Sequence, residues 1–208
     1  MVEENKQLAN EDRLPPGQKL LDKLPVLQYG GIPQGIDLES WRLRIWGCVK
    51  APVSLTWKEF DALPKVERTL DLHCVTRWSN YDTHWSGVTL QSMLEAGVIE
   101  LLPNANYVVQ HAAGYSTSLP LAQMTAENFL LATHYEGERI TLEHGWPLRG
   151  LTGAMPDQAH HKDVYLWKGA KWLNGLEFTE ADKLGFWERS GYHNEADVWK
   201  EQRFAENL

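Results

Sequence analysis

Cys74 is the residue of this sequence with the widest chemical possibilities, and it stands in the run Leu72-His73-Cys74-Val75-Thr76-Arg77-Trp78-Ser79. The apolar residues before it predict a buried strand that ends at the thiol, and the polar and aromatic residues after it predict a loop. A thiol in that position can be a soft metal ligand, a nucleophile or an inert buried side chain. Arg77 and His73 would favour a thiolate, but strand alternation turns His73 to the opposite face.

Two stretches far from Cys74 carry groups that suit an anion. His144-Gly145-Trp146-Pro147-Leu148-Arg149 joins an imidazole, a tight turn and a guanidinium, and Trp167-Lys168-Gly169-Ala170-Lys171-Trp172 sets two ammonium groups around small residues. A phosphate-bearing ligand would use Arg149 and Lys171. The alternative for the second stretch is that Lys168 and Lys171 are surface charges beside core tryptophans.

Several other kinds of site lack their sequence signatures. Neither Cys-x-x-Cys nor His-Glu-x-x-His occurs, and the adjacent His160 and His161 are typical of a solvated loop rather than of a zinc site. Glycine-rich phosphate loops and the Gly-x-Ser-x-Gly motif of hydrolases are also absent. The sequence therefore does not predict a nucleotide-binding loop or a serine hydrolase.

Charge and composition narrow the class of protein further. The net charge of −8, from 20 basic and 28 acidic residues, argues against a nucleic-acid partner. No signal peptide and no run of about 20 apolar residues is present, so we expect no membrane association and a cytoplasmic location with Cys48 and Cys74 reduced. The ten tryptophans are typical of an aromatic-rich core, or of a cleft for a flat heteroaromatic ligand.

The elements that must position these residues are short and intermixed. Alternating or continuous apolar patterns predict strands over residues 41–46, 66–74, 107–110, 139–142, 163–167 and 172–178. Capping and turn residues predict short helices over 57–63, 88–96 and 125–131. Because no regular strand–helix–strand period occurs, we expect an α+β fold with mixed sheets.

Length and composition predict one domain with decorated ends. The chain has 208 residues, of which 43% are hydrophobic and 23% charged, enough to bury a large core. The polar residues 1–24 are interpreted as an N-terminal arm, and residues 25–208 as the domain. Trp187, Tyr192 and Trp199 predict that the tail from Gly185 packs back on the body.

Taken together, the sequence resembles the sulfite oxidase-type molybdopterin-binding oxidoreductases, in particular the small haem-free branch. It is also similar to the periplasmic methionine sulfoxide reductase catalytic subunits. The matching stretches span nearly the whole chain and are 14–18, 25–30, 73–79, 85–88, 114–120, 144–149, 167–172 and 186–193. This resemblance implies the sulfite oxidase-like molybdopterin-binding fold.

The same resemblance implies roles for individual residues. Cys74 would be the thiolate ligand of molybdenum and, with Arg77 as the nearby cation, a catalytic residue. A high-valent metal would stabilise a buried thiolate that is otherwise costly. The other expected cofactor-binding residues are His111, His144, Arg149, Gly169, Ala170 and Lys171.

The implied activity is two-electron oxo transfer at a mononuclear molybdenum–pterin centre. Its small-molecule substrate would be sulfite or an S- or N-oxide. Because no Cys-x-x-Cys-His motif for haem attachment occurs, electrons would pass to or from a separate partner. Residues 150–162 make one linker longer than is usual in the family. Two alternatives stay open: a molybdenum-independent cysteine enzyme, and a pterin-binding module without activity.

Overall fold

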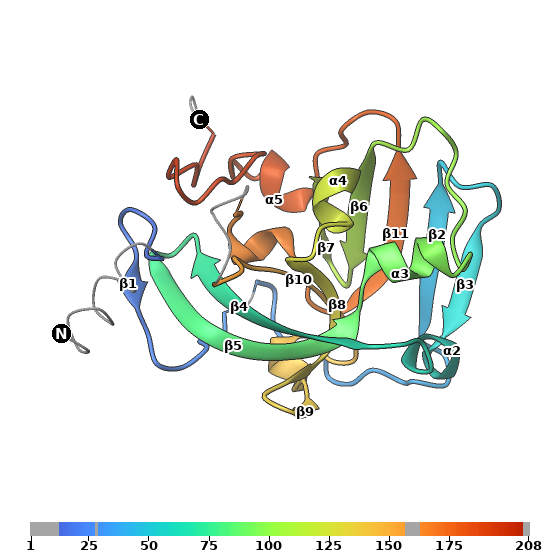
Figure 1. Ribbon diagram of the computed structural model, residues 1–208, viewed down its shortest axis with the longest axis horizontal. Coiled ribbons are helices and arrows are strands. Elements are labelled where there is room, and N and C mark those ends of the chain that lie inside the picture. Colours follow the sequence, from blue (N-terminus) through green and yellow to red (C-terminus); the bar gives the residue numbers. More distant parts are fainter. Residues whose placement is uncertain (1–12, 28, 157–162, 206–208) are drawn as a thin grey trace.

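The computed structural model describes residues 13–27, 29–156 and 163–205. Within these ranges the chain forms two mixed β-sheets with a few short helices around them (Figure 1). The predicted α+β class and single-domain architecture are confirmed. The boundary between arm and domain at residue 24 stays a prediction.

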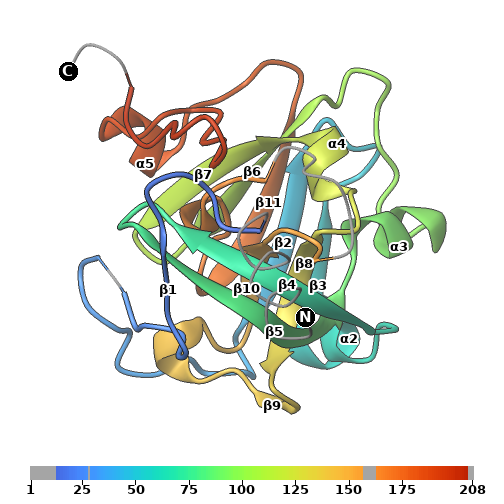
Figure 2. The ribbon, with the colours of Figure 1, turned by 60° about the vertical axis from the view of Figure 1, so that its left-hand side comes forward.

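The first sheet is organised around β5 (Trp78–Val88), the longest strand described. Its order is β1-β5-β8-β10, with β4 also paired to β5 and β9 to β8. The bounds are Lys19–Leu20 for β1, Val66–Cys74 for β4, Phe129–Tyr135 for β8, Glu138–Arg139 for β9 and Arg149–Thr152 for β10. Strands β4 and β5 form a long curved hairpin, and β1 runs parallel to the start of β5 (Figure 2).

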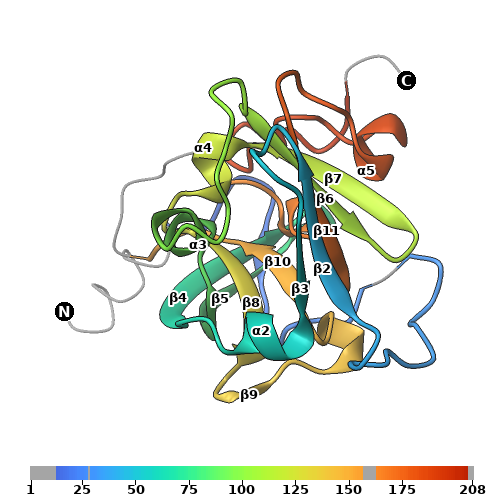
Figure 3. The ribbon, with the colours of Figure 1, turned by 90° about the vertical axis from the view of Figure 1, so that its right-hand side faces the viewer.

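The second sheet has the order β3-β2-β11-β6-β7 (Figure 3). Its strands are β2 (Arg42–Gly47), β3 (Val53–Thr56), β6 (Tyr107–Ala112), β7 (Tyr115–Pro120) and β11 (Leu173–Thr179). The α-helices are α2 (Trp57–Asp61), α3 (Leu90–Glu95), α4 (Leu121–Met124) and α5 (Phe186–Arg189). Two 3₁₀ turns, η1 (Leu142–His144) and η2 (Leu166–Lys168), complete the elements.

A shared hydrophobic core joins the two sheets. Leu43 and Ile45 of β2, Val108 of β6 and Leu176 of β11 are all at most 1% exposed, and they belong to one cluster with Leu131 of β8. Burial of such side chains is worth about 1.5–3 kcal/mol each. This core fixes the spacing between the sheets and therefore the shape of any cavity at their edge.

Several predicted elements are confirmed. Thr56 caps α2 through a capping box with Glu59, as the Thr-x-x-Glu spacing predicts. The predicted helix over 88–96 is α3, and Gly97 follows it with φ +68°. The tail also packs on the body, since Ala196 and Val198 are fully buried.

Three other predictions were wrong. The helix predicted over 125–131 is instead a turn followed by β8, because a continuous apolar run does not distinguish a buried strand from a buried helix. The strand predicted over 163–167 is a single bridge at Val164 followed by η2. The strand predicted over 139–142 ends at Arg139 and gives way to η1.

The region after Cys74 is the most consequential correction. The sequence predicted a loop there, but β5 starts at Trp78 after only three connecting residues. The polar residues Ser79 and Asn80 are buried at the start of β5, because β1 and β4 pair with this end of the strand. Linker residues 150–152 likewise belong to β10, and its residues 157–162 lie outside the described ranges. Across the described residues, no helix combines the length and apolar character that crossing a membrane requires.

Candidate active site

A cavity of about 280 Å³ opens between the end of β4, the residues after η2 and helix α5. It brings together Cys74, His144, Arg149, Gly169 and Lys171, which are far apart in the sequence. The remaining lining side chains are mostly apolar or aromatic, and they are Leu24, Pro25, Leu27, Tyr29, Val75, Thr76, Trp78, Tyr115, Leu166, Trp167, Trp172, Trp187 and Tyr192.

Cys74 is the last residue of β4 and is 7% exposed. Its Sγ lies 3.1 Å from Oγ1 of Thr76. Burial raises the pKa of the thiol, and the contact with Thr76 opposes that shift only in part. His73 is turned away, as alternation predicts, with Nδ1 2.8 Å from Oγ of Ser79. A neutral thiol is a poorer nucleophile than a thiolate, so the burial of Cys74 disfavours the alternative of a cysteine enzyme.

Arg149 supplies a buried positive charge to the cavity. The residue starts β10 and is 2% exposed, and Nη1 donates to the carbonyl of His144 at 3.0 Å. Its Nε has no partner among the described residues, and no described carboxylate pairs with the guanidinium. Burial lowers the pKa of Arg149 to about 10. A buried cation without a counter-charge is costly unless a ligand supplies the anion.

Lys171 adds a second cationic group to the cavity, and His144 adds an imidazole. Lys171 Nζ donates to the carbonyls of Leu27 at 2.7 Å and of Glu143 at 2.6 Å. Burial, followed by the charge of Arg149, lowers the pKa of Lys171 to about 7. The same two causes lower the pKa of His144 to about 4, so its imidazole is neutral near pH 7.

Two glycines allow these groups to approach one another. Gly145 ends η1 with φ +113°, and a Cβ there would lie 3.1 Å from Cβ of Arg149 and from Cα of Lys171. A Cβ on Gly169 would lie 2.3 Å from the carbonyl oxygen of Gly150 in β10. The backbone around Arg149 and Lys171 is therefore packed too closely to accept a larger residue at either glycine.

The segment 168–171, which we call the clasp, is held by a buried glutamine. Gln110 Nε2 donates to the carbonyl of Lys168 at 2.7 Å, and Oε1 accepts from N of Ala170 at 3.0 Å. Ala170 is fully buried and contributes through its backbone rather than by lining the cavity. Gln110 was not recognised in the sequence, where it is an ordinary residue inside a strand.

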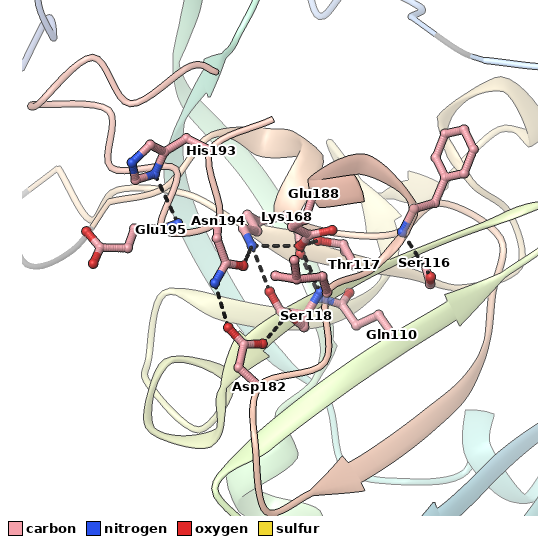
Figure 4. Close-up of polar contacts among 12 residues, drawn as sticks. Gln110, Ser116, Thr117, Ser118, Lys168, Asp182, Glu188, His193, Asn194 and Glu195 are labelled. Carbon is pink, nitrogen blue, oxygen red and sulfur yellow. Dashed lines mark hydrogen bonds and ion pairs between the residues drawn. The ribbon is translucent and has the colours of Figure 1, made fainter. Parts of the chain in front are cut away.

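Lys168 does not line the cavity, and its ammonium group lies in a polar network (Figure 4). Its Nζ donates to Oε1 of Glu188 at 2.7 Å and to the carbonyl of Ser118 at 2.9 Å, and both charged side chains are 1% exposed. The same Glu188 oxygen accepts from Oγ1 of Thr117 and from N of Ser118. This pair joins the clasp to α5, which carries Trp187 at the cavity. Lys168 is thus a buried anchor rather than a surface charge.

Besides Ala170, two predicted site residues do not line the cavity. His111 follows Gln110 on β6, so alternation turns it to the opposite face, where Nε2 lies 3.0 Å from Oε2 of Glu177. Arg77 has a side chain that is 62% exposed, and its Nη1 lies 3.9 Å from Oε1 of Glu201. The structure therefore brings together Cys74 with the predicted cations and glycine, but neither His111 nor Arg77.

Taken as a donor set, the cavity suits a particular kind of ligand. It offers one soft sulfur, the buried guanidinium of Arg149 and the half-buried ammonium group of Lys171, both without an acidic partner in the described ranges, and a neutral imidazole. Its aromatic lining suits a flat ring system. Among the described residues no three His, Cys, Asp or Glu side chains come together to hold a metal ion. The pair His160 and His161 lies outside the described ranges.

Comparison with known proteins identifies the chain's relatives. Residues 29–187 match the model of the oxidoreductase molybdopterin-binding domain family. The uncharacterized oxidoreductase YuiH of Bacillus subtilis is 42% identical over 202 residues, which cover 96% of each chain. Sulfite oxidase of Arabidopsis thaliana is 25% identical, over 79% of this chain and 48% of that protein. A putative protein-methionine-sulfoxide reductase subunit, YedZ1 of Azospira oryzae, is 29% identical, over 76% of this chain and 56% of that protein.

A solved structure confirms the predicted fold. The sulfane dehydrogenase SoxCD of Paracoccus pantotrophus superposes with a TM-score of 0.56, at 18% identity, over 71% of this chain and 40% of that chain. The likeness at this identity concerns the fold. It agrees with the mixed sheets and few short helices described above.

Proposed function

The chain belongs to the oxidoreductase molybdopterin-binding domain family and is an oxidoreductase of that class, and from this premise we propose that Cys74 is the protein ligand of its molybdenum. The observation that carries the proposal is the buried charge of Arg149, with Lys171 beside it, in the same cavity as the thiol. A pterin cofactor with a terminal phosphate would bring the missing anion, and its metal would accept the sulfur.

The residues present fit this group. Nε of Arg149 is buried without a partner among the described residues and is free to donate to an anion. Lys171 lies beside it, and its pKa of about 7 means that an anion would also fix its proton on Nζ. The neutral imidazole of His144 can donate or accept a hydrogen bond on a pterin ring. Gly169 lines the cavity, and its missing Cβ lets the clasp backbone pack against Gly150 beside Arg149.

When bound, the molybdenum–pterin group supplies two-electron oxo transfer between water and a substrate. The chain contributes position and environment. Cys74 presents its sulfur to the cavity from a buried strand end. Trp187 and Tyr192 form part of the aromatic lining of the cavity, past which a small-molecule substrate would reach the sulfur. Its chemical class is proposed as sulfite or an S- or N-oxide, in keeping with the names of the relatives.

We propose that electrons pass to or from a separate protein and that this chain carries no haem. The absence of a haem-attachment motif from the sequence supports both statements. A cytoplasmic location is proposed as well. An absorption spectrum of the purified protein tests the absence of haem directly. A Soret band that copurifies with the chain would contradict the haem-free assignment.

The decisive experiment measures molybdenum in the full chain purified from a host that makes the pterin cofactor. We expect near-stoichiometric molybdenum and a sulfur-to-molybdenum charge-transfer absorption in the wild type. Cys74→Ser should fold normally yet lose that absorption and the activity. Cys48→Ser is the matched control, since Cys48 does not line the cavity, and it should retain both. Unchanged turnover in Cys74→Ser would disprove the proposal.

A further inference from the structure

The turn that carries Cys74 is held from outside its own hairpin. N of Arg77 donates to the carbonyl of Cys74 at 3.1 Å, which closes the turn between β4 and β5. Arg77 has φ +70°, a left-handed conformation that is unfavourable for a residue with a side chain. A short turn of this kind is not fixed by its sequence, because it contains no glycine at the left-handed position.

Three carbonyl groups of this turn accept hydrogen bonds from the two ends of the chain. Gln18 Nε2 donates to the carbonyl of Cys74 at 3.1 Å, and N of Lys19 donates to that of Arg77 at 3.0 Å. Arg203 Nη1 donates to the carbonyl of Val75 at 2.9 Å, across 128 positions of sequence. All three donors lie outside residues 29–187, which match the family.

Arg203 is the most unusual of these donors. It is 5% exposed, and its guanidinium lies over the ring of the fully buried Tyr165, 5.0 Å from the centroid. Its Nη2 reaches the carbonyl of Pro16 at 3.3 Å and Oε1 of Glu201 at 3.5 Å. One buried cation therefore contacts the Cys74 turn and the N-terminal segment together.

The N-terminal segment is shaped for this contact. Gly17 has φ +68°, and a Cβ at that position would lie 2.6 Å from Oε1 of Glu201 and 3.4 Å from Nη2 of Arg203. Gln18 N donates to the carbonyl of Pro15, so a tight turn precedes Gln18 and directs its side chain to Cys74. Gln18 itself is 7% exposed.

We propose that Arg203 and Gln18 are positioning residues for Cys74, which hold the turn so that the sulfur keeps one orientation toward the cavity. This inference rests on the proposed role of Cys74 as the molybdenum ligand. Neither residue touches the sulfur. They act through the backbone carbonyls of Cys74 and Val75, and a charged donor buried at such a carbonyl is the stronger kind of hydrogen bond.

The first test measures the pH-independent rate constant with which iodoacetamide alkylates the Cys74 thiolate, taken from the full pH profile, because the charge of Arg203 also lowers the pKa of that thiol. It uses the full chain from a host that cannot make the pterin, in a Cys48→Ser background. Arg203→Gln should raise the rate about tenfold or more, since a hydrogen bond from a charged group is lost. Gln18→Ala removes a neutral bond and should raise it about threefold. Arg203→Lys keeps the charge and should lie between wild type and Arg203→Gln.

Arg13→Gln is the matched control. Arg13 also ties the N-terminal segment to the β4–β5 hairpin, through Asp71 and Asp82, but it contacts no residue of the turn. Its alkylation rate should stay within about twofold of wild type, because the turn keeps all its donors. If Arg203→Gln and Gln18→Ala alkylate no faster than Arg13→Gln, the inference is wrong. Should Arg203→Gln not fold, Gln18→Ala decides the question alone.

A second readout uses protein loaded with cofactor. Arg203→Gln should shift the sulfur-to-molybdenum charge-transfer absorption at unchanged molybdenum content, and Arg203→Lys should restore part of the shift. An absorption identical to wild type in Arg203→Gln would contradict the inference. The proposed function fails separately, if Cys74→Ser keeps its molybdenum and turnover. The alkylation rates without cofactor do not depend on that result.

Discussion

The cavity has two differently built parts, the cationic part around Arg149 and Lys171 and the thiol part at Cys74. The cationic part is held chiefly by Gln110, which lies within the family-matched residues 29–187, and by the Lys168–Glu188 pair at the end of that region. The thiol part is held by the ends of the chain. The cationic part concentrates positive charge that has no acidic partner among the described residues. The thiol part supports a turn in which Arg77 takes an unfavourable left-handed conformation.

This difference indicates that binding of an anion and orientation of the Cys74 sulfur depend on different parts of the fold. Charge around Arg149 selects an anion, and its effect depends on burial. Orientation of Cys74 depends on a few long-range hydrogen bonds. Changes in the cationic part should therefore alter how much cofactor is retained, and changes in the thiol part should alter how the sulfur behaves. The following predictions test that separation.

Breaking the buried pair should have the largest effect on stability. Lys168→Met leaves Glu188 buried without its cation, which costs about 3–5 kcal/mol in the free energy of unfolding. Urea denaturation measures this loss. Lys183→Met is the control, since Lys183 is 57% exposed and its pair with Glu177 is worth less than about 1 kcal/mol. Equal losses in the two variants would contradict the structural role of the pair.

Replacing Arg149 should separate cofactor binding from stability. Arg149→Met removes a buried charge without a described acidic partner, so the cofactor-free chain should be unchanged or more stable by about 1–4 kcal/mol. The same variant should retain less than about a tenth of the wild-type molybdenum, because a buried charge–phosphate contact is worth 2–5 kcal/mol.

The control for this separation is Arg139→Met. Arg139 makes a two-pronged ion pair with Asp61 away from the cavity, and its side chain is 45% exposed. The variant should keep its molybdenum and lose less than about 1 kcal/mol of stability. A cofactor-free Arg149→Met that unfolds more easily than Arg139→Met would show that the guanidinium stabilises the fold itself. Thermal unfolding and metal analysis together distinguish these outcomes.

The sequence predicts the cationic part of the site better than the thiol part. His144, Arg149, Gly169 and Lys171 stand in two short contiguous stretches, and the structure brings both into one cavity with Cys74. Contiguous motifs of this kind keep their local geometry, so their residue types can be read directly. His111 does not line this cavity, and sequence spacing alone does not tell which face of β6 its side chain takes.

The remaining elements depend on contacts that no local pattern contains. Near its start β5 contains the polar residues Ser79 and Asn80, which are typical of a loop. They form a strand because β1 and β4 pair with this end of β5. In the sequence Arg203 resembles any basic residue of a polar tail. Only the structure shows that it is buried and donates to the carbonyl of Val75. Tertiary context overrides local propensity in both cases. Such long-range pairings are fixed by the whole fold rather than by nearby residues.

Anion binding to the cationic part should weaken as pH rises. Lys171 in the cofactor-free chain has a pKa of about 7, and a bound anion favours its protonated form. Above pH 7 binding must therefore take up a proton, so affinity falls by up to about tenfold per pH unit. Sulfate is the suitable probe because it does not titrate between pH 6 and about 9. Calorimetry should show this fall in wild type and a flatter profile in Lys171→Met.

Thr76→Val should have the smallest effect, and it tests the thiol part alone. The Thr76 hydroxyl lowers the pKa of Cys74 against the larger effect of burial. Its loss should raise that pKa further, by less than about one unit, because one weak hydrogen bond is involved. The pH profile of alkylation in a Cys48→Ser background measures the shift. Thr179→Val, which loses only a bond to the carbonyl of Ala181, should leave the profile unchanged.

Because Thr76 contacts the sulfur but supports no turn carbonyl, its variant should move the pKa without the large rate increase expected for Arg203→Gln. A rate increase of that size in Thr76→Val would show that orientation of the sulfur depends on its own neighbour and not on the chain ends.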